Sequence, residues 1–339
     1  LFVWMGEILF RTRLSENLFA GLSPWMQKLP GGLIHVNVVG CALFAAISGS
    51  SAATVATVGK MSIPELRKRK YPEKILLGSL AGSGTLGLLI PPSIILIIYG
   101  VTVQESIAKL FIAGIIPGIM IALIFMSYVI IWSLINKKSM PKYVENFSFL
   151  EKIRKSKQLL PVIILISAVI GSIYTGVATA TEAASLGVVG ALILSYFQKS
   201  LTIETFKQSL LGATKTSCMI AFILAGSTFL SLAMGFTGLP RNLAIWIQNM
   251  ELSPYVLIFV LMIFYIILGM FLDGISAVVL TMAIIEPMIR QAGFDMIWFG
   301  IFLVIVVEMA QITPPVGFNL FVLQGMANKD MGFIARSAF

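Results

Sequence analysis

The chain has 339 residues, of which 58% are hydrophobic and only 12% are charged, and its mean hydropathy is +0.96. Soluble domains are about 45–50% apolar and about 25% charged, so this composition excludes an ordinary soluble fold and predicts an all-α polytopic membrane protein. The net charge of +9 comes from lysines and arginines grouped in short loops, which is typical of cytoplasmic loops beside phospholipid headgroups and not of a nucleic-acid-binding surface.

Two cysteines and one histidine offer little for redox or metal chemistry. Cys41 and Cys218 lie in apolar segments without metal-ligand spacing, so we expect two free, packed core residues. His35 is also expected to be packed. The sequence has no Ser/His/Asp set, no HExxH and no P-loop, so it predicts neither an enzyme nor the use of ATP by this chain.

The chain opens with a short apolar segment, residues 1–10, which we expect to be the end of a membrane helix. Because residue 1 is Leu and this run is too short to span a bilayer, we expect a longer membrane protein that extends beyond both ends of this chain. Residues 11–29 mix charged side chains with Leu, Phe and Trp, a pattern that predicts an amphipathic helix near the membrane interface.

Next comes a polar interruption, SGSS at residues 48–51, between apolar arms at 33–47 and 52–63. Each arm has about a dozen residues, whereas a spanning helix needs about 20. Irregular backbone survives at membrane depth only where protein buries it or where it lines a wet cavity. The pattern therefore predicts a re-entrant hairpin. A second hairpin is predicted at arms 254–272 and 275–289, with Leu-Asp-Gly at its tip.

Each predicted hairpin is followed by a long apolar segment that contains two adjacent prolines. Residues 75–99 hold GSGT and then Pro91-Pro92, with the break expected within 79–93. Residues 297–323 hold Pro314-Pro315. Tandem prolines remove two amide donors and clash with the preceding helical turn, so both segments are predicted to be broken helices.

Between the two copies, the sequence predicts conventional spans at residues 110–135, 160–174, 183–197 and 217–234. Basic loops at 60–74 and 136–158, and a third between Lys199 and Lys215, are predicted to be cytoplasmic. Glu182 is expected to cap the helix that follows it.

The two halves align as an internal repeat. The same interval of sequence separates Gly49 from Gly274, Ser51 from Ser276 and Asn17 from Asn242, and the two double prolines are separated by nearly the same interval. The number of crossings between the copies predicts opposite orientations, so we expect an inverted repeat of the kind found in secondary transporters. The predicted division is residues 1–100 for the first repeat, 101–216 for connecting helices, 217–327 for the second repeat and 328–339 for the start of a C-terminal segment.

Hairpin tips and helix breaks expose carbonyl oxygens, amides and hydroxyls together, which suits a small hard cation such as Na⁺ beside a carboxylate-bearing solute. The residues expected to bind sodium are Ser48, Gly49, Ser50, Gly82, Thr85, Asp273, Gly274, Thr313 and Gly317. The residues expected to bind substrate are Ser51, Thr54, Pro92, Ser93, Ser276, Pro315 and Asn319.

Three alternatives stay open from the residues alone. Asp273 could be a sodium ligand, a group that orients ligands, or a simple N-cap of the helix after it. The double prolines could be structural kinks. Glu308, on the second broken helix, could face the solute or pair inside the bundle.

The motifs SGSSAATVATVG, GSGTLGLLIPPS, SIAKLFIAGIIPG, TATEAAS, MFLDG and ITPPVGFNLFVL occur in this order along nearly the whole chain. In these residues the chain resembles the large membrane subunit of the TRAP (tripartite ATP-independent periplasmic) transporters, the DctM-like proteins.

The resemblance implies Na⁺-coupled import of organic acids such as C4-dicarboxylates or sialic acids through the bacterial inner membrane, with no other cofactor. It implies an elevator motion of a hairpin domain against a scaffold, as in the wider ion transporter superfamily. It also implies two partners, a small DctQ-like membrane subunit and a DctP-like periplasmic substrate-binding protein. Its sodium sites fall on Ser48, Gly49 and Ser50 with residues 82–85, and on Asp273 with residues 313–317.

Two other hypotheses compete with this one. The chain could be a stand-alone sodium/dicarboxylate carrier of the same superfamily that needs no binding protein. It could also be a channel or an intramembrane enzyme, although paired hairpins favour slow, saturable transport.

Overall fold

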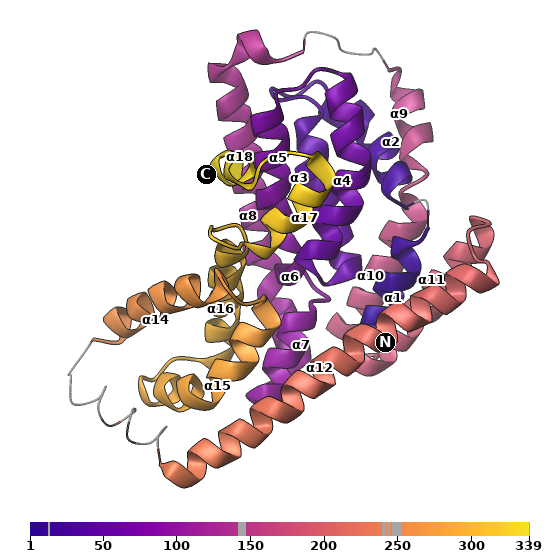
Figure 1. The fold of residues 1–339 in the computed structure, drawn as a ribbon. Helices are drawn as coiled ribbons and strands as arrows, with labels where there is room; N and C mark the ends of the chain where they lie inside the picture. The colour runs from indigo at the N-terminus through magenta and orange to yellow at the C-terminus, as the bar shows by residue number, and fades with distance from the viewer. Residues whose placement is uncertain (13, 142–146, 239–241, 243–244, 246–252, 339) are drawn as a thin grey trace.

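The structure is a computed structural model that describes residues 1–12, 14–141, 147–238, 242, 245 and 253–338 (Figure 1). Throughout this part of the chain the regular elements are helical. In chain order they are α1 Phe2–Phe10, α2 Leu14–Met26, α3 Ile34–Ser48, α4 Ser51–Lys68, α5 Glu73–Gly84, α6 Leu86–Leu89, α7 Ile94–Thr102, α8 Ile107–Ile135, the 3₁₀ turn η1 Lys137–Ser139, α9 Phe149–Ser156, α10 Leu160–Tyr174, α11 Ala180–Phe197, α12 Ile203–Thr237, α14 Pro254–Gly269, α15 Gly274–Gln291, α16 Met296–Gln311, α17 Phe318–Ala327 and α18 Met331–Ala338.

Several of these helices are suited to crossing a bilayer. Among the described residues, α8, α11, α12 and α15 are long and apolar enough, and two bent pairs raise the number from four to as many as six. The bends measure 41° between α5–α6 and α7, and 56° between α9 and α10. The expectation of an all-helical, multi-pass membrane protein is confirmed.

The first predicted hairpin is formed by α3 and α4, which pack against each other and against α5. Gly49 ends α3 with φ of 58°, a left-handed conformation that glycine adopts without steric cost. Ser50 then turns to extended backbone and caps α4 by accepting a hydrogen bond from the amide of Ala53 at 3.5 Å. The arms meet at this short turn.

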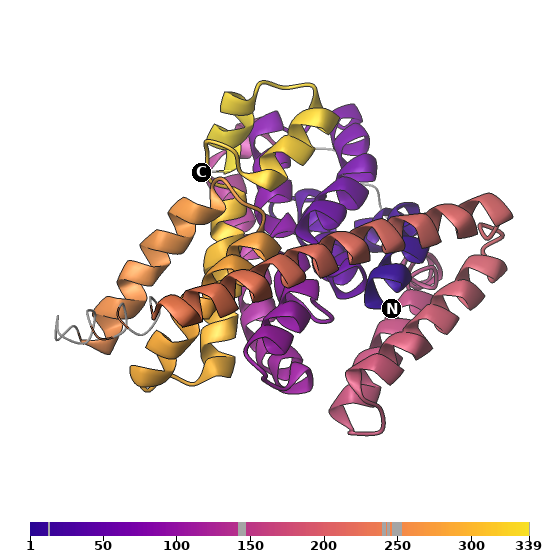
Figure 2. The same cartoon turned by 60° about the horizontal axis from the view of Figure 1, so that its bottom comes forward.

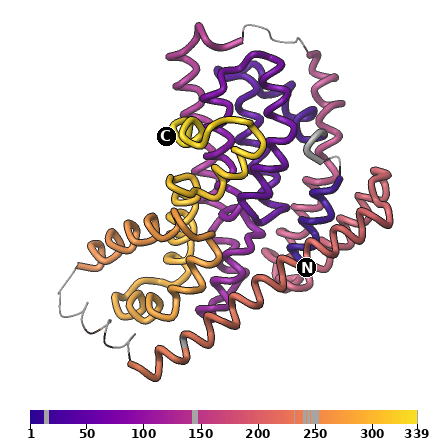
Figure 3. Tube along the Cα trace, viewed as in Figure 1, coloured from indigo at the N-terminus to yellow at the C-terminus, as the bar shows by residue number. Residues whose placement is uncertain are grey.

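The second hairpin is formed by α14 and α15, and the broken helices are α5–α6 with α7, and α16 with α17. In both breaks the peptide bond between the two prolines is cis. The Cα trace shows α17 and α18 lying over the first hairpin and α5, so the end of the chain returns to its first half (Figure 3).

Two pairs of helix starts and the double prolines share one interval between the two halves. Helices α4 and α15 each have 18 residues. The interval from the start of α4 to the start of α15 equals the interval from the start of α5 to the start of α16, and the double prolines repeat it. Ser50 therefore corresponds to Asp273, since each is the N-cap of its helix. The pairing of Gly49 with Gly274 and of Ser51 with Ser276, inferred from identical letters, differs from these bounds by two positions.

The three predicted basic loops are partly or largely helical. Helix α4 extends to Lys68, inside the predicted loop 60–74, and Phe149–Ser156 of the predicted loop 136–158 form α9. Residues 199–215 are not a loop, because α12 begins at Ile203 and runs without a break to Thr237. Thr202 and Thr205 form a capping box at its start, and the helix ends at Gly238, which has positive φ. Figure 2 shows α12 as a long rod crossing the molecule from α11 to the side where α15 lies.

Other predictions in these segments have mixed outcomes. Glu182 forms a capping box with Thr179, as expected for a helix cap. Cys41 is buried, but Cys218 is exposed, because α12 has little protein around it. His35 is buried, with Nε2 2.8 Å from the carbonyl oxygen of Pro30. The predicted interfacial segment 241–250 lies outside the described residues except for Asn242 and Ile245.

Helix α6 presses directly on the first hairpin tip. A Cβ atom at Gly87 would lie 2.6 Å from Cα of Ser51 and 2.6 Å from the carbonyl oxygen of Ser50. Both are backbone atoms, which cannot move aside as the end of a flexible side chain can. Gly87 thus sets how closely the break and the tip approach.

We expect Gly87→Ala to lower the melting temperature of the purified protein in detergent, because overpacking of this kind costs about 1–3 kcal/mol. Gly226→Ala on α12 is the matched control, since a Cβ there meets nothing within 4 Å. Equal melting temperatures for the two variants would contradict the close packing of α6 on the tip.

Candidate functional site

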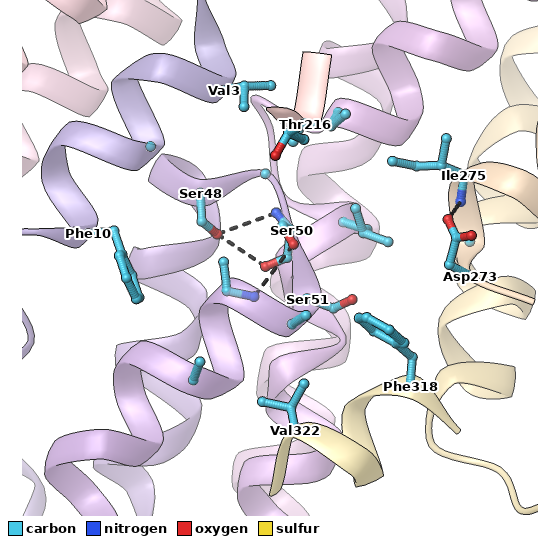
Figure 4. Close-up of a pocket in the computed structure, with 18 of the residues that line it drawn as sticks. Val3, Phe10, Ser48, Ser50, Ser51, Thr216, Asp273, Ile275, Phe318 and Val322 are labelled. Carbon is cyan, nitrogen blue, oxygen red and sulfur yellow. Dashed lines mark hydrogen bonds between the residues drawn. The ribbon is translucent and has the colours of Figure 1, made fainter. Parts of the chain in front are cut away.

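A cavity of about 540 Å³ lies between the two hairpin tips. Both tips contribute to it, together with residues from α1, α12 and α17. Its lining consists of Val3, Gly6, Glu7, Phe10, Phe44, Ser48, Gly49, Ser50, Ser51, Ala52, Ala53, Ala56, Leu88, Ile94, Thr216, Met219, Asp273, Gly274, Ile275, Gln311, Phe318 and Val322. Figure 4 shows Ser48, Ser50 and Ser51 on one side of this space and Asp273 on the other.

Hydroxyl groups hold the first tip in shape. The Ser48 and Thr54 hydroxyls are 2.8 Å apart, and the Thr54 hydroxyl donates to the carbonyl of Ser50 at 2.8 Å. The amide of Ser50 donates to Ser48 Oγ at 3.3 Å. These contacts satisfy the irregular backbone internally, which a segment at membrane depth requires.

Each tip is also joined to the proline break of its own half. The amide of Ile94, the first residue of α7, donates to the carbonyl of Gly49 at 3.3 Å. The amide of Gly317, the N-cap of α17, donates to the carbonyl of Met270 at 3.4 Å. Gly49 and Met270 are the C-caps of α3 and α14, so the same contact occurs in both halves.

At the second tip Asp273 is the N-cap of α15. Its Oδ2 accepts from the amides of Ile275 and Ser276 at 3.1 and 3.2 Å, and its Oδ1 accepts from the Ser276 hydroxyl at 2.5 Å. The capping alternative is what the structure shows. Because Asp273 also lines the cavity, capping and ligand binding are compatible, and the sodium role stays a prediction.

Of the residues predicted to bind, the cavity gathers Ser48, Gly49, Ser50, Ser51, Asp273 and Gly274. The others are not among its lining residues: Thr54, Gly82, Thr85, Pro92, Ser93, Ser276, Thr313, Pro315, Gly317 and Asn319.

Several of these outlying residues make contacts that explain their position. Thr85 donates its amide and its hydroxyl to the carbonyl of Gly82, at 3.1 and 2.6 Å, so the two satisfy each other. Ser93 caps α7 by accepting from the amide of Leu96 at 3.3 Å, and Thr313 donates its hydroxyl to the carbonyl of Met309. The binding roles of these residues stay predictions.

No motif in the sequence placed α1 and α12 at the site. Glu7 and Phe10 of α1 and Thr216 and Met219 of α12 line the cavity. Glu7 forms an ion pair with Arg11. A glutamate inside a short apolar run is a signal that could have directed attention to α1. Among the described residues that line the cavity, the charged ones are acidic, Glu7 and Asp273.

Glu308 lies on α16, one turn before Gln311, whose Nε2 donates to the carbonyl of Leu272 at the second tip at 3.3 Å. Its side chain is only 4% exposed and does not line the cavity. The Ser51 side chain lies close enough to interact with its carboxyl group. Neither carboxyl oxygen has a hydrogen-bond partner of ordinary geometry among the described residues, so the pairing alternative is not what the structure shows.

Comparison with known proteins places this architecture in a family. The profile described as "Tripartite ATP-independent periplasmic transporter, DctM component" matches residues 1–338.

Individual relatives agree with the profile. The C4-dicarboxylate TRAP transporter large permease protein DctM of Pseudomonas aeruginosa is 34% identical over 338 residues, which cover 99% of this chain and 78% of the relative. The 2,3-diketo-L-gulonate TRAP transporter large permease protein YiaN of Escherichia coli is 31% identical, covering 100% and 79%. The sialic acid TRAP transporter large permease protein SiaM of Vibrio cholerae is 30% identical, covering 95% and 75%. This chain therefore belongs to the DctM family of TRAP transporters, as a multi-pass membrane permease component and not an enzyme.

Proposed function

We propose that this permease component imports an organic acid, such as a C4-dicarboxylate or a sialic-acid-like compound, in symport with Na⁺ through the bacterial inner membrane. The observation that carries the proposal is the cavity between the two hairpin tips, which joins hydroxyls, two helix N-termini and a carboxylate. Helix N-termini favour the carboxylates of a substrate, and oxygen-rich turns favour a hard cation.

The cavity has no basic side chain among its described lining residues, so a carboxylate substrate would be held by amides, hydroxyls and helix ends. The N-termini of α4 and α15 both begin at the cavity, at Ser51 and Gly274. Ser51 is well placed to donate a hydrogen bond to the substrate. Thr54, Ser93, Ser276 and Asn319 do not line the cavity in this structure. We propose that they also bind the substrate, after the cavity has rearranged around it.

We propose that the two hairpins and two broken helices form an inverted repeat that moves as one body in an elevator motion. The interval shared by the starts of α4 and α15, the starts of α5 and α16, and the double prolines supports the repeat. Contacts that cross between the halves support the single body. Arg67, at the end of α4, donates to the carbonyl of Ala327 at 2.7 Å, and Arg290, at the end of α15, donates to the carbonyl of Val103 at 3.0 Å. Each hairpin thus holds the far end of the other half's broken helix.

The family's tripartite organisation supports two partners, a small membrane subunit and a periplasmic substrate-binding protein. One relative of this chain carries the printed name "Isethionate TRAP transporter permease protein DctMQ". We propose that this chain receives its substrate from such a binding protein, and the comparisons favour this over a stand-alone carrier.

Sodium coupling predicts that uptake into proteoliposomes containing the permease and its two partners requires an inward sodium gradient. With the same electrical potential but choline in place of sodium, uptake should fall to the level of empty vesicles. Equally fast uptake driven by a proton gradient in sodium-free buffer would contradict the coupling.

Asp273→Asn tests the second tip. Asparagine is also a good N-cap, so α15 should stay folded while the negative charge is lost. We expect the sodium concentration for half-maximal uptake to rise by about tenfold or more, since a charge–cation contact in a partly buried site is worth more than about 1 kcal/mol. Asp295→Asn, the N-cap of α16 outside the cavity, is the matched control. An unchanged sodium dependence in Asp273→Asn would remove this carboxylate from the ion site.

A further inference from the structure

We propose that Glu308 supplies the negative charge for a sodium ion bound at the first hairpin tip, reached from α16 in the other half of the chain. This inference rests on the sodium coupling proposed above and assigns a residue that the hairpin motifs do not contain.

The carboxyl group of Glu308 is buried inside the protein. Glu308 is 4% exposed, and both carboxyl oxygens lack a hydrogen-bond donor of ordinary geometry within the described residues. No ion pair involving it occurs in that part of the chain. A buried carboxylate without a cation or donors costs several kcal/mol, so the folded protein needs either a proton or a metal cation there.

Glu308 lies next to the first hairpin tip. The Ser51 side chain is the polar neighbour of the carboxyl group, and Ser51 itself lines the cavity. Glu308 therefore lies one side chain away from the space between the tips. Ser51 is also the first residue of α4, directly after the N-cap Ser50. The Ser51 side chain therefore lies between the carboxyl group of Glu308 and the hairpin turn.

The two hairpin tips differ in the charge of their N-cap residues. The second tip has its own carboxylate, the N-cap Asp273, whereas the corresponding N-cap in the first tip is the neutral Ser50. By the constant interval between the halves, the counterpart of Glu308 in the first half is Thr85, which bonds to Gly82. Apart from Glu7, which is paired with Arg11, each tip thus has one carboxylate near it, its own in one case and one from the opposite half in the other.

The acidic side chains at the cavity also affect how an anionic substrate would bind. An organic anion in this cavity would meet Asp273 directly and Glu308 behind Ser51, while Glu7 is compensated by Arg11. Negative charges close together in a partly buried cavity repel one another, so they disfavour binding of the anion unless cations accompany it. A cation at Glu308 would remove this repulsion at the first tip, which couples the two bound species through charge.

Sodium suits the oxygen groups available. The carboxyl group of Glu308 has the Ser51 side chain beside it, and the first tip adds the hydroxyl of Ser48 and the carbonyl of Ser50. Carboxylate, hydroxyl and amide oxygens are the ligands that hard cations prefer.

The test is Glu308→Gln in the purified permease with its small membrane subunit. Glutamine has the shape of a protonated glutamate but no charge, so it separates the two states. Thermal stability is titrated with NaCl at constant ionic strength, with choline chloride as the replacement. We expect the half-maximal sodium concentration for stabilisation to rise about tenfold or more, a difference of about 1.4 kcal/mol in binding. Glu204→Gln, on the exposed start of α12, should match the wild type.

Glu308→Asp keeps the charge on a shorter side chain and should retain sodium-dependent stabilisation at a raised half-maximal concentration. This variant keeps the inference open to refutation if Glu308→Gln does not fold, because sodium titration identical to that of the wild type in Glu308→Asp would also count against it. Sodium stabilisation unchanged in Glu308→Gln would show that the carboxyl is protonated and would overturn this inference alone. Absence of sodium-specific stabilisation in the wild type would overturn the sodium coupling as well.

Discussion

The structure depends on one constraint, which is that backbone leaving a helix inside a membrane must find hydrogen-bond partners in the protein. The two hairpin tips and the two proline breaks meet it by pairing with each other. Ile94 donates to the carbonyl of Gly49, and Gly317 donates to that of Met270. A tip and a break that satisfy each other leave part of their polar surface facing the cavity between the halves. The cavity is thus a consequence of how irregular backbone is tolerated.

The same constraint explains how much could be predicted from the sequence. Hairpin arms too short to span, tips made of small polar residues and breaks at adjacent prolines are all local features, so residues 48–51 and Asp273 could be predicted to line one cavity, as they do. The helix bounds add a second alignment of the halves, because identical letters pair Gly49 with Gly274, whereas the starts of α4 and α15 pair positions that differ from this by two. In the alignment by helix bounds, Ser50 and Asp273 are equivalent because each is the N-cap of its helix. Serine and aspartate are both good N-caps, so equivalent positions need not carry the same residue.

Features created by packing between distant segments could not be predicted. The arrival of α1 and α12 at the cavity depends on how the connecting helices cross the molecule, and local periodicity carries no record of it (Figure 2). The exposure of Cys218 has the same origin, since an apolar helix looks alike whether protein or lipid surrounds it. Glu308 was visible as a charge within an apolar segment, but its neighbour Ser51 comes from the other half of the chain.

Charge balance links this packing to function. A transporter of organic anions would be expected to place a basic side chain in its binding cavity, yet the described lining of this cavity is acidic where it is charged. A fixed arginine would bind the anion in both the presence and the absence of the coupling ion, and the anion could then cross alone. In the proposed sodium symport, carboxylates beside the tips would reverse this, because the site would become neutral enough for an anion only when cations occupy it. Obligatory coupling can therefore arise from the sign of the charges that line the cavity.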